Sequence, residues 1–181
     1  PAISELFART RTRTADLTGL GVALGPGSFT GLRIGMSVCK GMALALKLPV
    51  VGVPSLEILA AGQPILRRPM IALLQVGRGR FAWAHYTAAN NHWSREGEVR
   101  VSDAREIATE ITSPVYVCGE MGEEERRVLG RKWKTARLAS PAQSLRRPAV
   151  LAELAWQRLK SGQADDAAAL SPIYVHTLSN V

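Results

Sequence analysis

Residues 25–35 of this 181-residue chain read GPGSFTGLRIG and lie between the apolar run GLGVAL at 19–24 and a long apolar run that ends at Lys47. This order predicts a buried strand, a glycine-rich turn and a helix. Backbone N–H groups and the positive end of the helix then point at the turn, which is typical of an anion site. The candidate loop residues are Gly25, Gly27, Ser28, Thr30 and Gly31.

The same loop fits no general phosphate-binding fingerprint. For the G-x-x-x-x-G-K-[ST] loop the second glycine would fall at residue 30, which is Thr30. For G-x-G-x-x-G the third glycine would also fall at residue 30, whereas the glycine is Gly31. A structural turn in which Ser28 and Thr30 cap the helix therefore remains an alternative to anion binding.

The pattern outside the loop predicts two α/β lobes. The expected elements are a helix at 2–9, a strand at 19–24, a helix at 30–47, a strand at 48–53, a helix at 55–61, a linker at 63–69, strands at 70–76, 80–87 and 93–101, a helix at 102–111, a strand at 115–119 and helices at 123–129 and 148–160. The second lobe reads β-β-β-α-β-α, and the first has the same ending without the three opening strands. This duplication is the architecture of actin-like ATPases and sugar kinases. We expect lobes at 1–66 and 67–181, with the first three strands of the N-terminal lobe lying upstream of Pro1.

Helical periodicity divides the 30–47 segment into two faces. One face carries apolar residues and glycines, namely Ile34, Val38, Met42, Ala45 and Leu46 with Gly31, Gly35 and Gly41. The opposite face mixes basic and apolar residues, namely Arg33, Met36, Lys40, Leu44 and Lys47. Glycine lowers helix stability relative to Ala, so the glycines predict a close approach of another backbone.

Composition limits the classes of function. The net charge is +8, and 18 of the 23 basic residues are Arg, in scattered clusters that fit either a solvated surface or contact with RNA. The apolar run from Met42 to Val53 is interrupted by Lys47 and Pro49, and no signal peptide is visible, so we expect no membrane association. Cys39 and Cys118 form no metal or disulfide pattern, which favours buried thiols in a reducing cytoplasm.

The loop followed by CKGMALALKLPVVGVPSLEILA, residues 39–60, resembles the TsaB (YeaZ) family over residues 20–62, with weaker support from SPIYVH at 171–176. The resemblance implies a duplicated actin-like (ASKHA, ribonuclease H-like) fold. It also implies a cytoplasmic scaffold that dimerises with the TsaD catalytic subunit for threonylcarbamoylation of adenosine in tRNA. A TsaE-type ATPase would join them, tRNA would be met through the complex, and the chain alone would form a homodimer.

Comparison with the related TsaD family implies that the catalytic metal site is absent. TsaD carries VNHxEGH, whose two histidines bind the metal, and Ser55 and Leu59 stand at those positions here. Neither side chain can replace imidazole, so we expect no cofactor in this chain, and ATP and a metal ion in the partner subunits. The interface implied by the resemblance comprises Arg33, Met36, Lys40, Leu44 and Lys47, with the glycine face packed on its own sheet. An actin-like ATPase or kinase that binds nucleotide phosphates at the glycine loop is the alternative.

Overall fold

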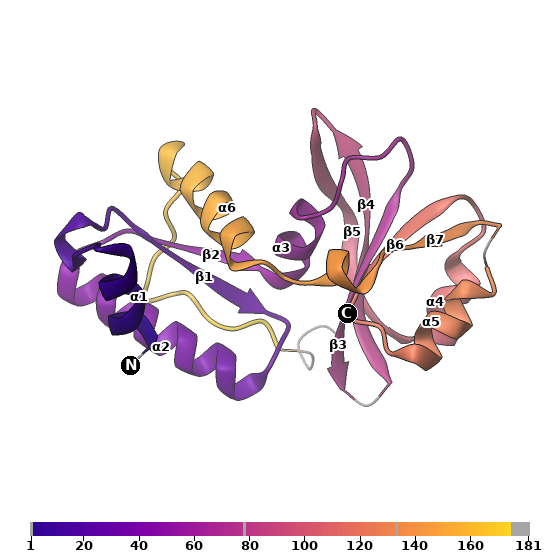
Figure 1. Cartoon of the computed structure of the whole chain (residues 1–181), viewed down its shortest axis with the longest axis horizontal. Helices are drawn as coiled ribbons and strands as arrows, with labels where there is room; N and C mark the ends of the chain where they lie inside the picture. Colours follow the sequence, from indigo (N-terminus) through magenta and orange to yellow (C-terminus); the bar gives the residue numbers. More distant parts are fainter. Residues whose placement is uncertain (1, 78, 133, 175–181) are drawn as a thin grey trace.

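The computed structural model describes residues 2–77, 79–132 and 134–174, and contains a two-stranded and a five-stranded sheet joined by helices (Figure 1). In chain order the elements are α1 (Ala2–Thr10), η1 (Thr14–Asp16), β1 (Leu20–Gly25), α2 (Phe29–Leu46), β2 (Val50–Pro54), α3 (Ser55–Ala61), β3 (Met70–Gly77), β4 (Arg80–Ala89), β5 (His92–Asp103), α4 (Ala104–Glu110), β6 (Val115–Gly119), α5 (Glu123–Gly130), β7 (Ala136–Leu138), η2 (Pro141–Ser144) and α6 (Pro148–Lys160).

The larger sheet has the strand order β5-β4-β3-β6-β7. Strands β3, β4 and β5 are antiparallel, whereas β6 and β7 run parallel to β3. The β4–β5 hairpin turns at Asn90 and Asn91, whose φ angles of 50° and 62° are left-handed. Asn tolerates this conformation better than most residues, and two such residues form a turn that matches the twist of a hairpin.

Alternation along β3 separates the two cores of this sheet. Met70, Ala72 and Leu74 belong to the cluster that contains Leu56 and Leu59 of α3. Ile71 and Leu73 belong to the opposite cluster, which includes residues of α4 and α5. Successive side chains of a strand point to opposite faces, so an uninterrupted apolar strand fills both cores.

The smaller sheet consists of β1 and β2 in parallel and lies between α2 on one face and α6 on the other (Figure 1). On the α2 side, Val22 and Val50 pack with Met36, Cys39 and Ala43. On the α6 side, Val51 and Val53 pack with Ala155 and with Ile58 of α3. Helix α3 contributes to this core and to one core of the larger sheet, and so links the two parts.

The segment after α6 returns along the smaller sheet. The Asp165 carboxylate accepts hydrogen bonds from the Gly52 N–H at 2.8 Å and from the Arg158 guanidinium at 3.0 Å. Further along, the Ile173 N–H donates to the Leu24 carbonyl at 2.7 Å. Val175 and His176, the end of the SPIYVH stretch, lie outside the described residues.

The helices and strands predicted from the sequence are confirmed, with shifts of a few residues at their ends. The short strand β7 and the turns η1 and η2 were missed, because three or four residues show no periodicity. The lobe boundary at 66/67 stays a prediction. Helix α6, from the predicted second lobe, packs on the smaller sheet of the first.

We expect the native protein to react slowly with a thiol reagent at neutral pH. Cys39 and Cys118 are both free and buried, and burial raises the pKa of both thiols, that of Cys118 to about 12. The thiolate is the reactive form, so neither side chain supplies an accessible nucleophile. Titration with Ellman's reagent should detect two thiols per chain in guanidinium chloride, and almost none before unfolding. Rapid reaction of the native protein would contradict this packing.

Candidate functional site

The glycine loop forms a tight turn between β1 and α2 that the chain itself covers. A Cβ atom on Gly25, whose φ is 105°, would lie 2.8 Å from the Ile173 carbonyl oxygen and from Leu32 Cδ1. Only glycine fits that conformation in that space. Ser28 is the N-cap of α2, since its Oγ accepts a hydrogen bond from the Gly31 N–H at 3.3 Å. The predicted capping role is thus confirmed for Ser28, whereas Thr30 lies within the first helical turn.

Groups of both signs surround the loop. An Arg146 nitrogen lies 3.4 Å from the position of a Cβ on Gly27, and Arg146 also forms an ion pair with Glu120 at 2.6 Å. The Ile173 carbonyl contributes a hydrogen-bond acceptor on the other side. The Arg146 guanidinium already binds a carboxylate, and the neighbouring carbonyl oxygen repels negative charge. The loop therefore attracts an anion only weakly. Anion binding by the loop stays a prediction, and the contacts favour a packing role.

Helix α2 is oriented differently from the sequence prediction. Its buried residues are Met36, Cys39 and Ala43, which face the smaller sheet. Met36, only 5% exposed, was predicted to lie on the outward, partner-binding face, and this prediction is wrong. The physical reason is that α2 is apolar on almost every side. Its periodicity therefore defines two possible packing faces, and the sheet accepts the one without glycine.

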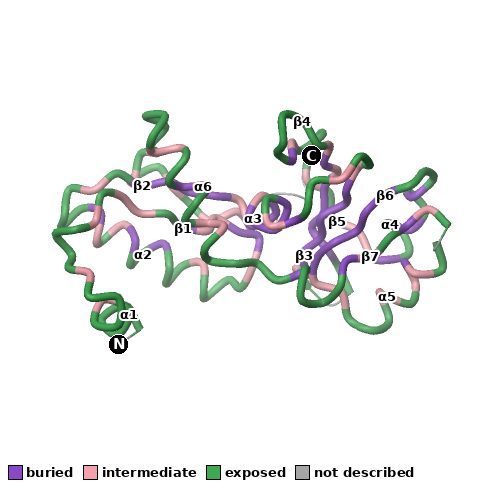
Figure 2. The backbone as a smooth tube through the Cα atoms, turned by 45° about the horizontal axis from the view of Figure 1, so that its top comes forward, coloured by how far each residue is buried: buried purple, intermediate pink, exposed green. Residues whose placement is uncertain are grey.

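The face predicted to pack on the sheet is exposed instead (Figure 2). Ile34 is 60% exposed and Val38 42% exposed. A Cβ atom added to Gly35 or Gly41 would meet no atom within 4 Å. We call the exposed residues Gly31, Ile34, Gly35, Val38, Gly41 and Ala45 the α2 stripe. Its flat apolar surface is unused within the chain, which the sequence prediction missed.

The basic residues predicted at the partner interface mostly contact the chain itself. The Arg33 guanidinium lies 4.0 Å from the centre of the Phe29 ring, and its Nε donates to the Tyr174 hydroxyl at 2.9 Å. The Lys40 ammonium donates to the Ala168 carbonyl at 3.2 Å. Lys47 is exposed at the left-handed C-cap of α2. Arg33 and Lys40 thus hold the C-terminal segment beside the helix, and their role at an interface stays a prediction.

Leu44 is 84% exposed and lies one turn after Gly41, but it is turned away from Ile34 and Val38 around α2. Its predicted contact with a partner likewise stays a prediction. By length and composition α2 is apolar enough to cross a membrane, and it is the one such helix in the described part of the chain. The apolar run that stands out in the sequence, Met42 to Val53, is interrupted by Lys47 and Pro49 and covers only the end of this helix. In the fold, one side of α2 forms the core of the smaller sheet.

Ser55 and Leu59, which were predicted to stand where the TsaD family has its two histidines, lie in the first and second turns of α3. Both are fully buried, and Leu59 belongs to the core against the larger sheet. The Ser55 hydroxyl has no hydrogen-bond partner among the described residues. The described residues also contain no group of three or more His, Cys, Asp or Glu placed to hold a metal ion. This part of α3 therefore packs as core.

Comparisons with known proteins agree with this architecture. The family described as TsaD, tRNA N6-adenosine threonylcarbamoyltransferase, matches residues 1–116. The tRNA threonylcarbamoyladenosine biosynthesis protein TsaB of Bacillus subtilis is 30% identical over 182 residues, covering 97% of this chain and 76% of that protein. The YeaZ structure from Pseudomonas aeruginosa superposes with a TM-score of 0.72 at 23% identity, covering 94% of this chain and 80% of that one.

Other relatives match over shorter stretches. The TsaB protein of Escherichia coli is 32% identical over 93 residues, which are 50% of this chain and 40% of that protein. The alignment with the TsaB protein of Buchnera aphidicola covers 42% of that protein. The chain thus matches less than half the length of these two relatives. Together with the match to the Bacillus protein over 97% of this chain and with the shared fold, these similarities show that the chain belongs to the TsaB family.

Proposed function

We propose that the chain is a non-catalytic subunit of the machinery that makes threonylcarbamoyladenosine in tRNA, and that the α2 stripe docks on a TsaD-type catalytic subunit. The relatives named TsaB support the pathway. The observation that supports the docking is the exposure of the stripe, which combines the branched apolar side chains of Ile34 and Val38 with Gly35 and Gly41, at which an added Cβ would meet no atom of the chain.

The energetics of α2 favour a partner helix on the stripe. Each glycine inside a helix costs about 1 kcal/mol relative to Ala, and Gly35 and Gly41 recover none of this cost inside the fold. Small residues let a second helix approach closely. At that short distance, the side chains of Ile34 and Val38 can be buried against the partner helix. Helix α1 lies at the same end of the molecule (Figure 1) and leaves Ile3 and Leu6 exposed.

A TsaD-type subunit is the occupant that the comparisons favour. The match of residues 1–116 to the TsaD family means that such a subunit has a segment related to β1, α2 and β2. Two related helices can pair about an approximate two-fold axis, as in symmetric dimers. The same geometry allows two copies of this chain to pair when the catalytic subunit is missing. We also propose that a TsaE-type ATPase joins the complex.

We place the chemistry in the partner subunits. With Ser55 and Leu59 in the core, α3 offers no imidazole pair for a metal, so we assign the metal ion and ATP to the partners. Among the basic residues, Arg67, Arg68, Arg131 and Lys132 are exposed, and tRNA would meet such residues within the complex. We place this complex in the cytoplasm.

We further propose that the smaller sheet is the second half of a duplicated actin-like unit. In the larger sheet, the three antiparallel strands precede β6, and β3 pairs with it in parallel. The corresponding three strands of an N-terminal lobe would pair with the edge of β1 that β2 does not use. The similarity to the YeaZ fold supports this reading.

The test is complementation with a direct chemical measurement. The chain is expressed in cells depleted of their own TsaB, and the threonylcarbamoyladenosine content of tRNA is measured by mass spectrometry of nucleosides. We expect the content to recover, and we expect the purified chain alone to modify no tRNA. No recovery would contradict the assigned pathway. Modification by the chain alone would contradict the scaffold role, and ATP turnover by the isolated chain would favour the alternative ATPase.

A further inference from the structure

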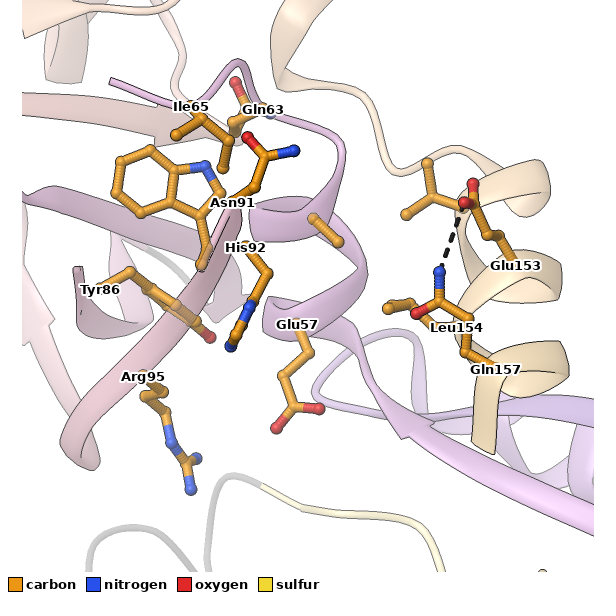
Figure 3. A pocket seen from close by; sticks show the side chains of 13 residues that line it. Glu57, Gln63, Ile65, Tyr86, Asn91, His92, Arg95, Glu153, Leu154 and Gln157 are labelled. Carbon is orange, nitrogen blue, oxygen red and sulfur yellow. Dashed lines mark hydrogen bonds between the residues drawn. The ribbon is translucent and has the colours of Figure 1, made fainter. Parts of the chain in front are cut away.

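A pocket of about 420 Å³ lies between α3, the β4–β5 hairpin and α6, away from the α2 stripe and the glycine loop (Figure 3). Its size is within the range of small-molecule sites. Ala61 and Ile65 contribute apolar surface from α3 and the segment after it, and Val150 and Leu154 contribute apolar surface from α6. The walls come from three separate parts of the sequence.

Two buried polar groups at this pocket lack partners. Tyr86 is 1% exposed, and its hydroxyl makes no hydrogen bond within the described residues. Figure 3 shows this hydroxyl on the side of the ring that faces Glu57 and His92. The indole N–H of Trp93, which also lines the pocket, is likewise buried and unpartnered in the described structure. Buried polar groups in native proteins nearly always have a partner, so at the edge of a pocket these two groups are free to bond to a ligand without breaking a bond inside the chain.

Opposite charges line the same pocket without pairing. Glu57 extends from α3 and Arg95 from β5 (Figure 3), and neither forms an ion pair or a hydrogen bond with any described residue. Burial raises the pKa of Glu57, and the nearby charges of Arg95 and Arg158 oppose this rise. By contrast, Arg146 and Arg158 are each paired with a carboxylate in this fold. Glu57 and Arg95 are thus close enough to interact but stand apart across the opening.

We propose that this pocket binds a small zwitterion of the free α-amino acid class, with an apolar side chain. The ammonium group is recognised by the Glu57 carboxylate and the Tyr86 hydroxyl oxygen, and the carboxylate by the Arg95 guanidinium. The side chain lies against Ala61, Val150 and Leu154. A ligand with a single charge would engage only one of these two groups: an amine would make no contact with the exposed Arg95 guanidinium, and a carboxylate would leave the half-buried Glu57 carboxylate unpaired, so either ligand forms fewer charge-assisted hydrogen bonds than a zwitterion.

The test compares ligands that differ by one charged group. Leucine, 4-methylpentanoate and 3-methylbutylamine share the same carbon chain, but the second lacks the ammonium group and the third lacks the carboxylate. Each is titrated into the ¹⁵N-labelled protein, and chemical shifts are followed at the Trp93 indole N–H. We expect saturable shifts with leucine, and at least tenfold weaker binding of both analogues. No shift with leucine, methionine or phenylalanine up to their solubility limits would overturn the proposal, as would equal binding of the amine.

Variants separate recognition from structure. Glu57→Gln, Arg95→Gln and Tyr86→Phe should each weaken leucine binding at least tenfold. Tyr86→Phe should leave the melting temperature unchanged or raised, because the hydroxyl has no partner in the free protein. Glu98→Gln, an exposed change on β5 outside the pocket, is the matched control and should bind leucine normally. If the three pocket variants bind leucine as tightly as the control, Glu57, Arg95 and Tyr86 do not recognise it. Failure of TsaD binding would not affect this result, since the α2 stripe is a separate surface.

Discussion

Replacing Ile34 and Val38 by Asp should abolish binding to a TsaD-type subunit while the chain remains folded. Both side chains are exposed in the free chain, at 60% and 42%, so each substitution should change the free energy of unfolding by less than about 1 kcal/mol. In the complex the same positions would bring carboxylates into an apolar helix contact. Loss of a hot-spot residue near the centre of an interface costs ~2 kcal/mol or more, and two such losses together should weaken binding more than about 100-fold.

Size-exclusion chromatography with light scattering and a direct affinity measurement check this result, with circular dichroism as the test of folding. Leu44→Asp is the matched control, because Leu44 is the most exposed apolar residue of α2 and lies outside the stripe. We expect the Leu44 variant to bind normally. Normal binding by the double variant would exclude the stripe. Loss of binding in the Leu44 variant would restore the interface predicted from the sequence, which includes Arg33 and Lys47.

This experiment addresses the point at which sequence reasoning failed. The periodicity of residues 30–47 correctly predicted a helix, and the strand–loop–helix order correctly predicted Ser28 as its cap. Periodicity did not predict which side faces the sheet, because Met36 and Ala43 on one side compete with Ile34 and Val38 on the other. Glycine within a helix predicts internal packing, whereas Gly35 and Gly41 mark surface that the chain leaves open.

The pocket could not be predicted for a different reason. Glu57, Tyr86, Arg95 and Leu154 are spread over almost a hundred positions, and no spacing rule relates them. Their encounter depends on α3 contacting both the larger sheet and α6. By contrast, strands such as 70–76 and 115–119 are continuous apolar runs bounded by turns, and their position at the centre of a sheet follows from local sequence. Local elements were therefore predictable, and a site assembled from several of them was not.

Replacing Gly119 by Ala adds a single methyl group at the centre of the larger sheet, and we expect it to lower the free energy of unfolding strongly. Gly119 ends β6 with a φ of 134°, and a Cβ there would lie 1.8 Å from the Leu73 carbonyl oxygen on β3. Gly119→Ala would force apart the β3 and β6 strands, which are neighbours at the middle of the sheet. Strained backbone and backbone overlap together should cost about 4 kcal/mol or more, a large part of the ~5–15 kcal/mol that stabilises a typical domain.

Gly97→Ala is the matched control, since Gly97 also has a positive φ, 67°, but no atom lies within 4 Å of its Cβ position. The left-handed conformation alone should cost about 1–2 kcal/mol. Thermal and denaturant unfolding of both variants would separate the two contributions. If the two losses are equal, contact with β3 contributes nothing and backbone conformation explains both. A much larger loss at Gly119 would show that β6 can approach β3 this closely only because Gly119 has no side chain. Gly35 and Gly41 of α2 likewise leave space, but on the surface, where we propose that a second chain packs.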